Sequence, residues 1–276
     1  VTGADLRHVH YLRTLAESRR IIAAADSAER AVVVGASFIG MEAAAALRSR
    51  NLHVTVVAPE EIPFEPTLGA ELGNRIRQVH EQNGVEFRLG RTLSAIDERS
   101  VVLDDGSRLE ADFVVIGIGV RPNTALAEAA GAEVDDGVLV DEYLETTVPG
   151  IFAAGDIARW PAPVPEGRVR IEHWAVAQRL GQAAARSIAG RRAPFRDVPF
   201  FWTRHFDVGV AFSGYGGPWS SVRVDEGDDG NLSVFYLADG DERAMATVGR
   251  DLESLRFEAK LEARAATALE RGSVSA

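Results

Sequence analysis

The sequence predicts an α/β fold with a parallel sheet, followed by an α+β part with an antiparallel sheet. In the first part, valine-rich runs alternate with helical segments, and the apolar runs are continuous, as in strands buried on both faces. In the second part, short alternating segments separated by Gly/Asp turns follow residue 199. The length of 276 residues accommodates about two domains of ~150 residues each.

The first elements form a β–α–β unit. Residues 31–34 (AVVV) end at Gly35 and are typical of a buried parallel strand. Residues 38–50 are rich in alanine and leucine and end in arginines, which favours a helix. Residues 52–57 (LHVTVV) are the next strand, and such a unit implies a parallel sheet.

The alternation continues to about residue 130. An amphipathic helix is predicted over 68–84, where Asn-Gly ends it, and a strand follows at 85–90. An Asp-Gly pair at 105–106 indicates a hairpin turn, and FVVIGIG at 113–119 is typical of a buried strand. A short helix follows, with Pro122 near its start.

After Gly131 the pattern changes. We expect two short strands separated by a Val-Pro-Gly turn at 148–150. The second strand, 151–153, leads to a Gly-Asp corner at Asp156, which we expect to be followed by a helix start, and a long alanine-rich helix is predicted over 172–189. Pro194 and Pro199 bracket a boundary, after which we expect an antiparallel meander and a closing helix over 250–270.

The composition excludes several kinds of protein. The chain has no cysteine, hence no disulfide, no thiolate-bound iron–sulfur cluster and no dithiol within these residues. Its net charge of −11 argues against nucleic-acid binding, which requires a basic face. No run reaches the ~18 apolar residues of a membrane span, so we expect a soluble, cytoplasmic protein without membrane contact. Lys260 is the only lysine, which excludes a GK[ST] phosphate loop, and the histidine spacing predicts no metal site.

A glycine-rich turn follows the first strand. The segment VVVGASFIGME fits G-x-G-x-x-G with Ser37 in place of the second glycine. In a dinucleotide site, Gly35 makes the tight turn, the backbone near Ser37 approaches the pyrophosphate, and Gly40 lets the helix pack closely. The helix start, Phe38 and Ile39, then offers N–H groups to the phosphates. A glycine turn between any strand and helix is the alternative, and the flanking strands favour the nucleotide site.

The segment PEE after the second strand bears on the choice of nucleotide. Glu60 and Glu61 come slightly later than the usual acid that accepts from a ribose 2′-hydroxyl. No arginine lies between Arg50 and Arg75 to accommodate a 2′-phosphate. We therefore expect NADH to be preferred over NADPH; the alternative for each glutamate is a solvated turn residue.

Five stretches together resemble the FAD-dependent pyridine nucleotide–disulfide oxidoreductase superfamily. Within it, they are most similar to NADH-dependent ferredoxin reductases of the putidaredoxin-reductase and apoptosis-inducing-factor-like type. The stretches are VVVGASFIGMEAAAAL, FVVIGIGVRPNTALAEAAG, TTVPGIFAAGDIA, IEHWAVAQRLGQAAA and PFFWTRHFDVGVAFSGYG. They follow the family's order and cover nearly the whole chain. TxVPGIFAAGD is specific to the family, whereas GxSxxG alone is not.

The resemblance implies three parts. Residues 1–125 resemble a crossover segment and a Rossmann-like NAD(P)H-binding domain with a parallel sheet. Residues 126–193 resemble the second part of an FAD-binding domain, and residues 194–276 resemble a C-terminal α+β reductase domain with an antiparallel sheet. In the family, the first half of the FAD domain carries its own GxGxxG, so the chain resembles a protein without its beginning. We expect that these residues alone do not retain FAD, and that 131–190 is prone to self-association or disorder through an open sheet edge.

The resemblance also assigns roles around NADH. Glu42 resembles the family glutamate near the nicotinamide carboxamide, and Gly117 and Gly119 resemble the strand end that lies against the nicotinamide. For Glu42 the alternative is an acid at a helix N-terminus, favoured by the helix dipole. For the two glycines it is tight packing beneath the sheet, which is compatible with the nicotinamide contact.

Four further residues resemble flavin contacts. Asp156 matches the aspartate at the ribityl–phosphate part of FAD, His173 and Trp174 lie near the pyrimidine edge, and Trp202 faces the isoalloxazine. The alternatives are a helix cap for His173, a core aromatic for Trp174 and a buried core tryptophan for Trp202.

These roles imply an FAD-dependent NADH oxidoreductase with a catalytic site that includes Glu42 and Trp202. Electrons would pass from NADH through the flavin to a ferredoxin or Rieske-type [2Fe–2S] protein, without a side chain as general acid or base in the hydride step. A disulfide reductase or NADH oxidase of the same superfamily is one alternative, although the chain has no C-x-x-C and no HPT-type histidine motif. A module that binds NADH or a protein without redox activity is the other.

Overall fold

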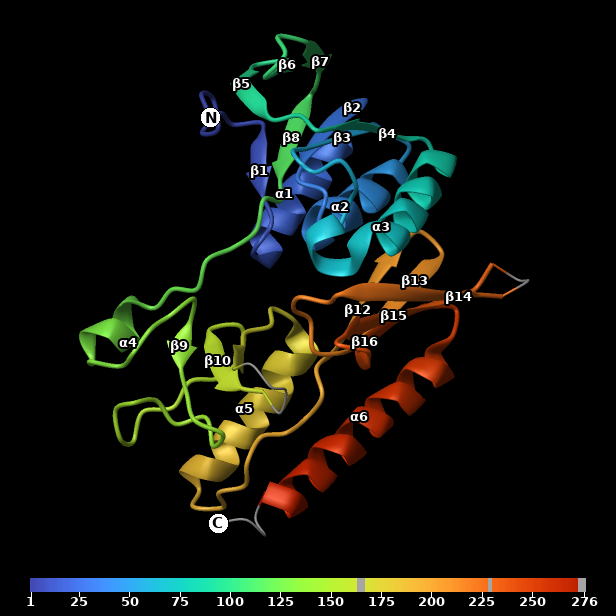
Figure 1. The fold of residues 1–276 in the computed structure, drawn as a ribbon. Helices are drawn as coiled ribbons and strands as arrows, with labels where there is room; N and C mark the ends of the chain where they lie inside the picture. Colours follow the sequence, from blue (N-terminus) through green and yellow to red (C-terminus); the bar gives the residue numbers. More distant parts are fainter. Residues whose placement is uncertain (163–166, 228–229, 273–276) are drawn as a thin grey trace. The chain divides into compact units, whose positions relative to one another are not determined.

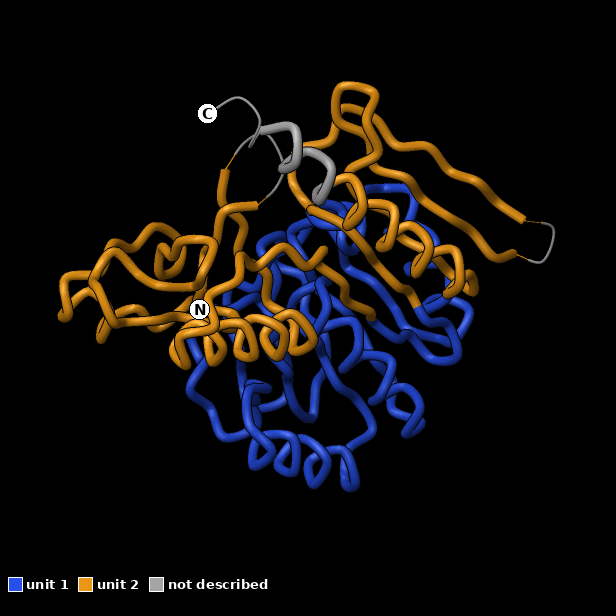
Figure 2. The backbone as a smooth tube through the Cα atoms, turned by 90° about the horizontal axis from the view of Figure 1, so that it is seen from below, with its two compact units in different colours: residues 1–120, 203–209 blue, residues 121–202, 210–276 orange. Residues whose placement is uncertain are grey.

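The computed structural model describes residues 1–162, 167–227 and 230–272, with side chains through Arg264. The chain divides into two compact units (Figure 2). Unit 1 is Val1–Val120 with Thr203–Gly209, and unit 2 is Arg121–Trp202 with Val210–Ala276. The division into three domains stays a prediction. None of the helices described is both long and apolar enough to span a bilayer.

Unit 1 is built on a five-stranded parallel sheet in the order β1-β8-β2-β3-β4 (Figure 1). Its strands are β1 (Val9–Tyr11), β2 (Arg30–Val34), β3 (His53–Ala58), β4 (Val85–Leu89) and β8 (Phe113–Ile116), and each neighbouring pair is parallel. The first four strands in chain order are connected by the helices α1 (Leu15–Ala25), α2 (Phe38–Arg48) and α3 (Glu65–Gln82). The predicted parallel α/β fold is confirmed, with its elements close to the expected positions.

A small antiparallel sheet packs on one face of the parallel sheet. It consists of β5 (Leu93–Asp97), β6 (Ser100–Leu103) and β7 (Arg108–Glu110). Side chains alternate between the faces of a strand, and Val32, Val57 and Val114 pack with Ile96 and Leu103 of the small sheet. The intervening valines of the central strands are buried on the other face, which explains the continuous apolar runs.

Unit 2 contains a five-stranded sheet in the order β12-β13-β16-β15-β14 (Figure 1). The strands are β12 (Phe200–His205), β13 (Val208–Gly214), β14 (Ser221–Glu226), β15 (Leu232–Ala238) and β16 (Asp241–Val248). The turn between β12 and β13, with the strand ends beside it, belongs to unit 1. The closing helix α6 (Asp251–Gly272) packs Phe257 and Leu261 on Phe235 and Met245 of the sheet. The predicted antiparallel sheet and closing helix are confirmed.

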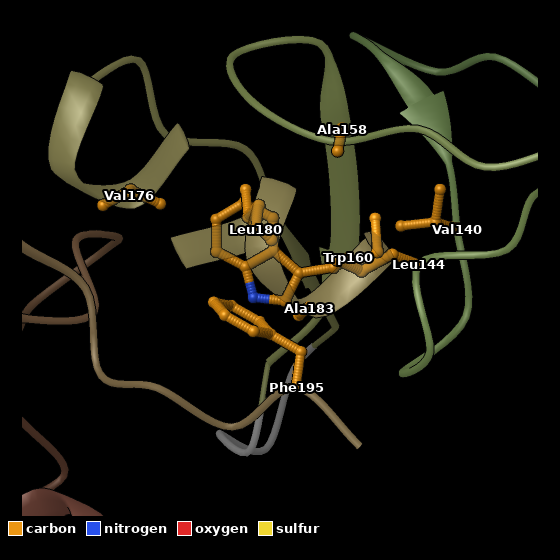
Figure 3. Close-up of a cluster of buried hydrophobic side chains, with 9 residues drawn as sticks. Val140, Leu144, Ala158, Trp160, Val176, Leu180, Ala183 and Phe195 are labelled. Carbon is orange, nitrogen blue, oxygen red and sulfur yellow. The ribbon is translucent and has the colours of Figure 1, made fainter. Parts of the chain in front are cut away.

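A second core in unit 2 surrounds Trp160 (Figure 3). This core joins α5 (Trp174–Ile188) to a small sheet in the order β11-β10-β9. The strands of that sheet are β9 (Val138–Leu139), β10 (Ala158–Pro161) and β11 (Arg168–Val169), and the short helix α4 (Ala125–Ala129) precedes β9. The rings of Trp160 and Phe195 meet edge to face, with their centroids 5.8 Å apart. Val176 and Leu180 extend from α5 into this core.

Two predictions in the middle of the chain are wrong. Residues 151–153 do not form a sheet strand, because Phe152 makes only an isolated bridge, to Glu145, among the described residues. The segment after Asp156 is the strand β10 rather than a helix start. Its burial alternates, with Ala158 and Trp160 buried and the residues between them more exposed, which is the period of a strand.

Candidate functional site

The loop between β2 and α2 is a tight glycine turn. Gly35 has a φ of +107°, and a Cβ atom on it would lie 2.3 Å from the carbonyl oxygen of Gly117. A Cβ atom on Gly40 would lie 2.0 Å from the carbonyl oxygen of Gly35. The Gly35 N–H donates to the Val57 carbonyl at 2.8 Å, and the Gly117 N–H donates to the Val34 carbonyl at 2.8 Å. The structure therefore brings the three predicted glycines together, and a side chain does not fit at Gly35 or Gly40.

The helix α2 begins directly after this turn. Ser37 is its N-cap residue, is exposed, and makes no capping hydrogen bond through its side chain. Phe38 and Ile39 form the first positions of the helix, and the Phe38 ring contacts the Phe64 ring with centroids 5.0 Å apart. A helix start without a side-chain cap, beside a turn that admits close approach, suits a phosphate group.

The end of β3 carries the acid predicted to contact the ribose. The half-buried Glu60 accepts the Gly90 N–H through its backbone carbonyl at 3.1 Å, while its carboxylate has no hydrogen-bond partner among the described residues. The neighbouring Arg91 N–H donates to the Ala58 carbonyl at 3.0 Å, so the tertiary structure brings an arginine to this strand end. The Arg91 guanidinium pairs with Asp105, with Nε and Oδ2 3.0 Å apart. No local pattern indicates this position of Arg91, because the parallel pairing of β3 and β4 brings it there.

Glu42 lies beyond the first turn of α2. That first turn contains no acidic residue, so the alternative of an acid favoured by the helix dipole is wrong. The Oε1 atom of Glu42 instead accepts from the hydroxyl of Thr203 at 2.6 Å.

For Gly117 the tight-packing alternative is confirmed, since a Cβ atom there would lie 3.1 Å from the Gly40 nitrogen. For Gly119 it is wrong, because nothing lies within 4 Å of a Cβ atom.

In unit 2, Asp156 occupies a sharp corner after Gly155, whose φ is +81°. The Asp156 backbone carbonyl accepts from Nη1 of Arg170 at 3.1 Å. Its half-buried carboxylate meets no hydrogen-bond donor among the residues described. A carboxylate accepts hydrogen bonds, so this one suits a ligand that carries hydroxyl groups.

An aromatic cluster in unit 2 joins the other three predicted flavin contacts. The Trp202 ring lies 5.0 Å from the Trp174 ring and 5.1 Å from the His173 ring between centroids. His173 caps α5, because its Nδ1 accepts the Ala175 N–H at 3.3 Å, which confirms that alternative. Trp174 is 61% exposed and Trp202 is 42% exposed, so the core alternatives for both are wrong. Exposed aromatic rings in a cluster suit a flat aromatic ligand.

The structure also reveals a group that the sequence did not indicate. His80 and His205 are both fully buried, and their ring nitrogens Nε2 and Nδ1 lie 3.1 Å apart. The two residues are 125 positions apart, so no local pattern relates them. Within the described part of the chain, no group of three or more His, Cys, Asp or Glu residues has a geometry for a metal ion.

Comparison with known proteins gives consistent matches. The sequence model of the pyridine nucleotide-disulphide oxidoreductase family matches residues 1–181. Rhodocoxin reductase of Rhodococcus erythropolis is 37% identical over 85% of this chain and 56% of its own length. The ferredoxin–NAD(+) reductase component of the anthranilate 1,2-dioxygenase system of Burkholderia cepacia is 35% identical over 90% of this chain and 63% of its own length.

The fold has a close counterpart among solved structures. The covalent putidaredoxin reductase–putidaredoxin complex contains a chain that matches with a TM-score of 0.89 and 30% identity, over 95% of this chain and 64% of that one. The chain thus spans somewhat more than half the length of the relatives that it matches.

Proposed function

Because the chain belongs to the pyridine nucleotide-disulphide oxidoreductase family, we propose that it acts in an FAD-dependent NADH oxidoreductase that supplies electrons to a ferredoxin or Rieske-type [2Fe–2S] protein. The observation that carries the proposal is the close approach of Gly35, Gly40 and Gly117 at the start of α2, where a side chain on Gly35 or Gly40 would collide with the backbone. The two relatives support the choice of partner, since one is a rhodocoxin reductase and the other a ferredoxin reductase component.

Residues of unit 1 would bind NADH. The start of α2, with Ser37, would hold the pyrophosphate, because uncapped N–H groups and the helix dipole favour negative charge. Glu60 would accept from a ribose hydroxyl, since its carboxylate has no partner in the described chain. Glu42 would accept from the nicotinamide carboxamide, and Gly119 leaves space for the ring.

Residues of unit 2 would contact FAD. Asp156 would accept from the ribityl hydroxyls, while His173, Trp174 and Trp202 would contact the flavin ring. When bound, FAD supplies the capacity to accept a hydride from NADH and to release electrons one at a time. The protein side chains position the cofactors, and none needs to act as a general acid or base in the hydride step.

The proposal is tested by binding and by reduction. Calorimetric titration of the chain should show NADH binding more tightly than NADPH, because the segment after β3 is acidic. Reduction of a [2Fe–2S] ferredoxin by NADH is then measured with FAD supplied, together with flavin absorbance per chain, because these residues alone are expected not to retain FAD. Tighter binding of NADPH would contradict the nucleotide assignment. NADH binding without any ferredoxin or dye reduction by protein that holds FAD would favour the alternative of a binding module.

A further inference from the structure

Four side chains of unit 1 form a continuous hydrogen-bonded polar chain, which is exposed at Glu42 and buried at Thr203, His205 and His80. Glu42 Oε1 lies 2.6 Å from Thr203 Oγ1, and Thr203 Oγ1 lies 3.3 Å from His205 Nε2. His205 Nδ1 lies 3.1 Å from His80 Nε2. This polar chain joins α2 to α3 through the end of β12, which belongs to unit 1.

The hydrogen bonds of the polar chain have one consistent direction. A carboxylate only accepts, so the Thr203 hydroxyl donates its proton to Glu42. The Thr203 oxygen then accepts from His205 Nε2, which places the proton of the neutral imidazole on Nε2. His205 Nδ1 therefore accepts from His80 Nε2, and His80 Nδ1 is left as a buried nitrogen without a partner. That is the pattern expected when both imidazoles are neutral and both carry the proton on Nε2.

Packing holds the two imidazoles in place. The His205 ring lies 5.4 Å from the Phe64 ring, and the His80 ring lies 5.2 Å from the Phe206 ring between centroids. Burial in this apolar surrounding lowers the pKa of His80 to about 3 and that of His205 to about 4. Neutral, immobile rings fix the direction of the Thr203 hydroxyl, and the hydroxyl in turn fixes the carboxylate of Glu42.

The exposed end of the polar chain leaves one acceptor atom unused. The Thr203 hydroxyl and the Arg204 N–H both bond to Oε1 of Glu42, at 2.6 Å and 3.4 Å. No donor contacts Oε2 among the residues that the structure describes, and the Glu42 side chain is exposed. The carboxylate is thus held through one oxygen and can accept from an external N–H group with the other.

We propose that Thr203 and His205, supported by His80, are positioning residues that hold Glu42 so that its Oε2 accepts from the carboxamide of bound NADH. This inference rests on the proposed function and deepens it. It attributes the protein's discrimination between an amide and other groups on the nicotinamide ring to the polar chain that holds Glu42. Two members of this polar chain, Thr203 and His205, come from the end of β12. A carboxylate in place of the amide would be repelled by Glu42.

The test compares three ligands by calorimetry. ADP-ribose lacks the nicotinamide, NAD⁺ carries the amide, and nicotinic acid adenine dinucleotide carries a carboxylate in its place. The wild-type chain should bind NAD⁺ more tightly than the nicotinic acid analogue. Thr203→Val should lower NAD⁺ affinity by about three- to tenfold, because it removes one hydrogen bond to a charged group, and leave ADP-ribose affinity unchanged. Thr203→Ser retains the hydroxyl and should restore NAD⁺ binding.

A double-mutant cycle separates positioning from a merely structural role. If Thr203 acts through Glu42, Thr203→Val should have no further effect on NAD⁺ binding in the Glu42→Ala background. An equal loss in both backgrounds would overturn the proposal, as would equal loss of ADP-ribose and NAD⁺ binding. Failure of the wild-type chain to bind ADP-ribose would instead refute the proposed nucleotide site.

Imidazole nitrogen NMR gives a readout that is independent of binding. His80 and His205 should both be neutral and protonated on Nε2 at pH 7, because only that arrangement satisfies the whole polar chain. In Thr203→Val the signals of His205 should change most. A proton on Nδ1 of His205 in the wild-type chain would contradict the direction of the hydrogen bonds and with it the proposal.

Discussion

Replacement of Gly40 by alanine has two opposite effects on the free energy of unfolding, a gain in helix propensity and a collision with the backbone. Gly40 is the third residue of α2, and alanine is more favourable than glycine in a helix interior by about 1 kcal/mol. The new Cβ atom, however, would lie 2.0 Å from the Gly35 carbonyl oxygen, whereas an ordinary contact begins at 3.4 Å. The backbone of the turn cannot move away without cost, because the Gly35 N–H donates a hydrogen bond to the Val57 carbonyl at 2.8 Å.

The collision should outweigh the gain in helix propensity. Overpacking of a well-packed site costs about 1–3 kcal/mol, so after the helix gain of about 1 kcal/mol we expect a net loss of up to about 2 kcal/mol in the free energy of unfolding. Moving α2 away from the turn should also weaken NADH binding by about tenfold, which corresponds to ~1.4 kcal/mol. Urea unfolding followed by circular dichroism measures the first quantity, and calorimetric titration measures the second.

Gly181 provides the matched control. It also lies inside a helix, α5, but nothing lies within 4 Å of a Cβ atom built on it. Gly181→Ala should therefore stabilise the chain by about 0.5–1 kcal/mol and leave NADH affinity unchanged. A Gly40→Ala chain that is as stable as Gly181→Ala, with unchanged NADH affinity, would refute the argument that the backbone approach at Gly40 excludes a side chain.

Three further predictions concern pH, the aromatic cluster and the choice of nucleotide. Since burial lowers the pKa of His80 to about 3 and of His205 to about 4, the unfolded chain takes up protons first as the pH falls below about 6.5. The free energy of unfolding should then decline towards pH 4, by up to about 1.4 kcal/mol per pH unit for each of the two histidines. In urea titrations, the double variant His80→Phe/His205→Phe should not show this decline. Trp202→Ala should lower FAD-dependent turnover with little change in Tm, because Trp202 is 42% exposed; a loss in Tm as large as that of Trp160→Ala, where the ring is 1% exposed, would contradict it. Arg91→Ala should leave the preference for NADH over NADPH unchanged in calorimetric titration, because its guanidinium is held in an ion pair; a marked change would assign Arg91 to the site.

The order of the elements could be predicted from the sequence because their patterns are local. Valine runs, alanine-rich helices and Gly/Asp turns each act within a few residues, and the parallel sheet of unit 1 followed from their alternation. The glycine turn at Gly35 and Gly40 was predictable for the same reason, since a tight turn between a strand and a helix constrains neighbouring residues. The predicted helix start after Asp156 was wrong, because this segment forms the strand β10. Its partners, β9 and β11, come from other parts of the chain and leave no mark in the local pattern.

The family, the strand and helix order and the glycine turn before α2 could be predicted without the structure, because all of them depend on residues close together along the chain. The contacts between distant segments, in contrast, became visible only in the folded chain. Neither Arg91 beside the end of β3 nor the link from Glu42 through Thr203 to the two histidines has a local signature. Burial gives such contacts their effect, because an imidazole removed from water changes its pKa and a hydroxyl between two fixed groups loses its freedom to rotate.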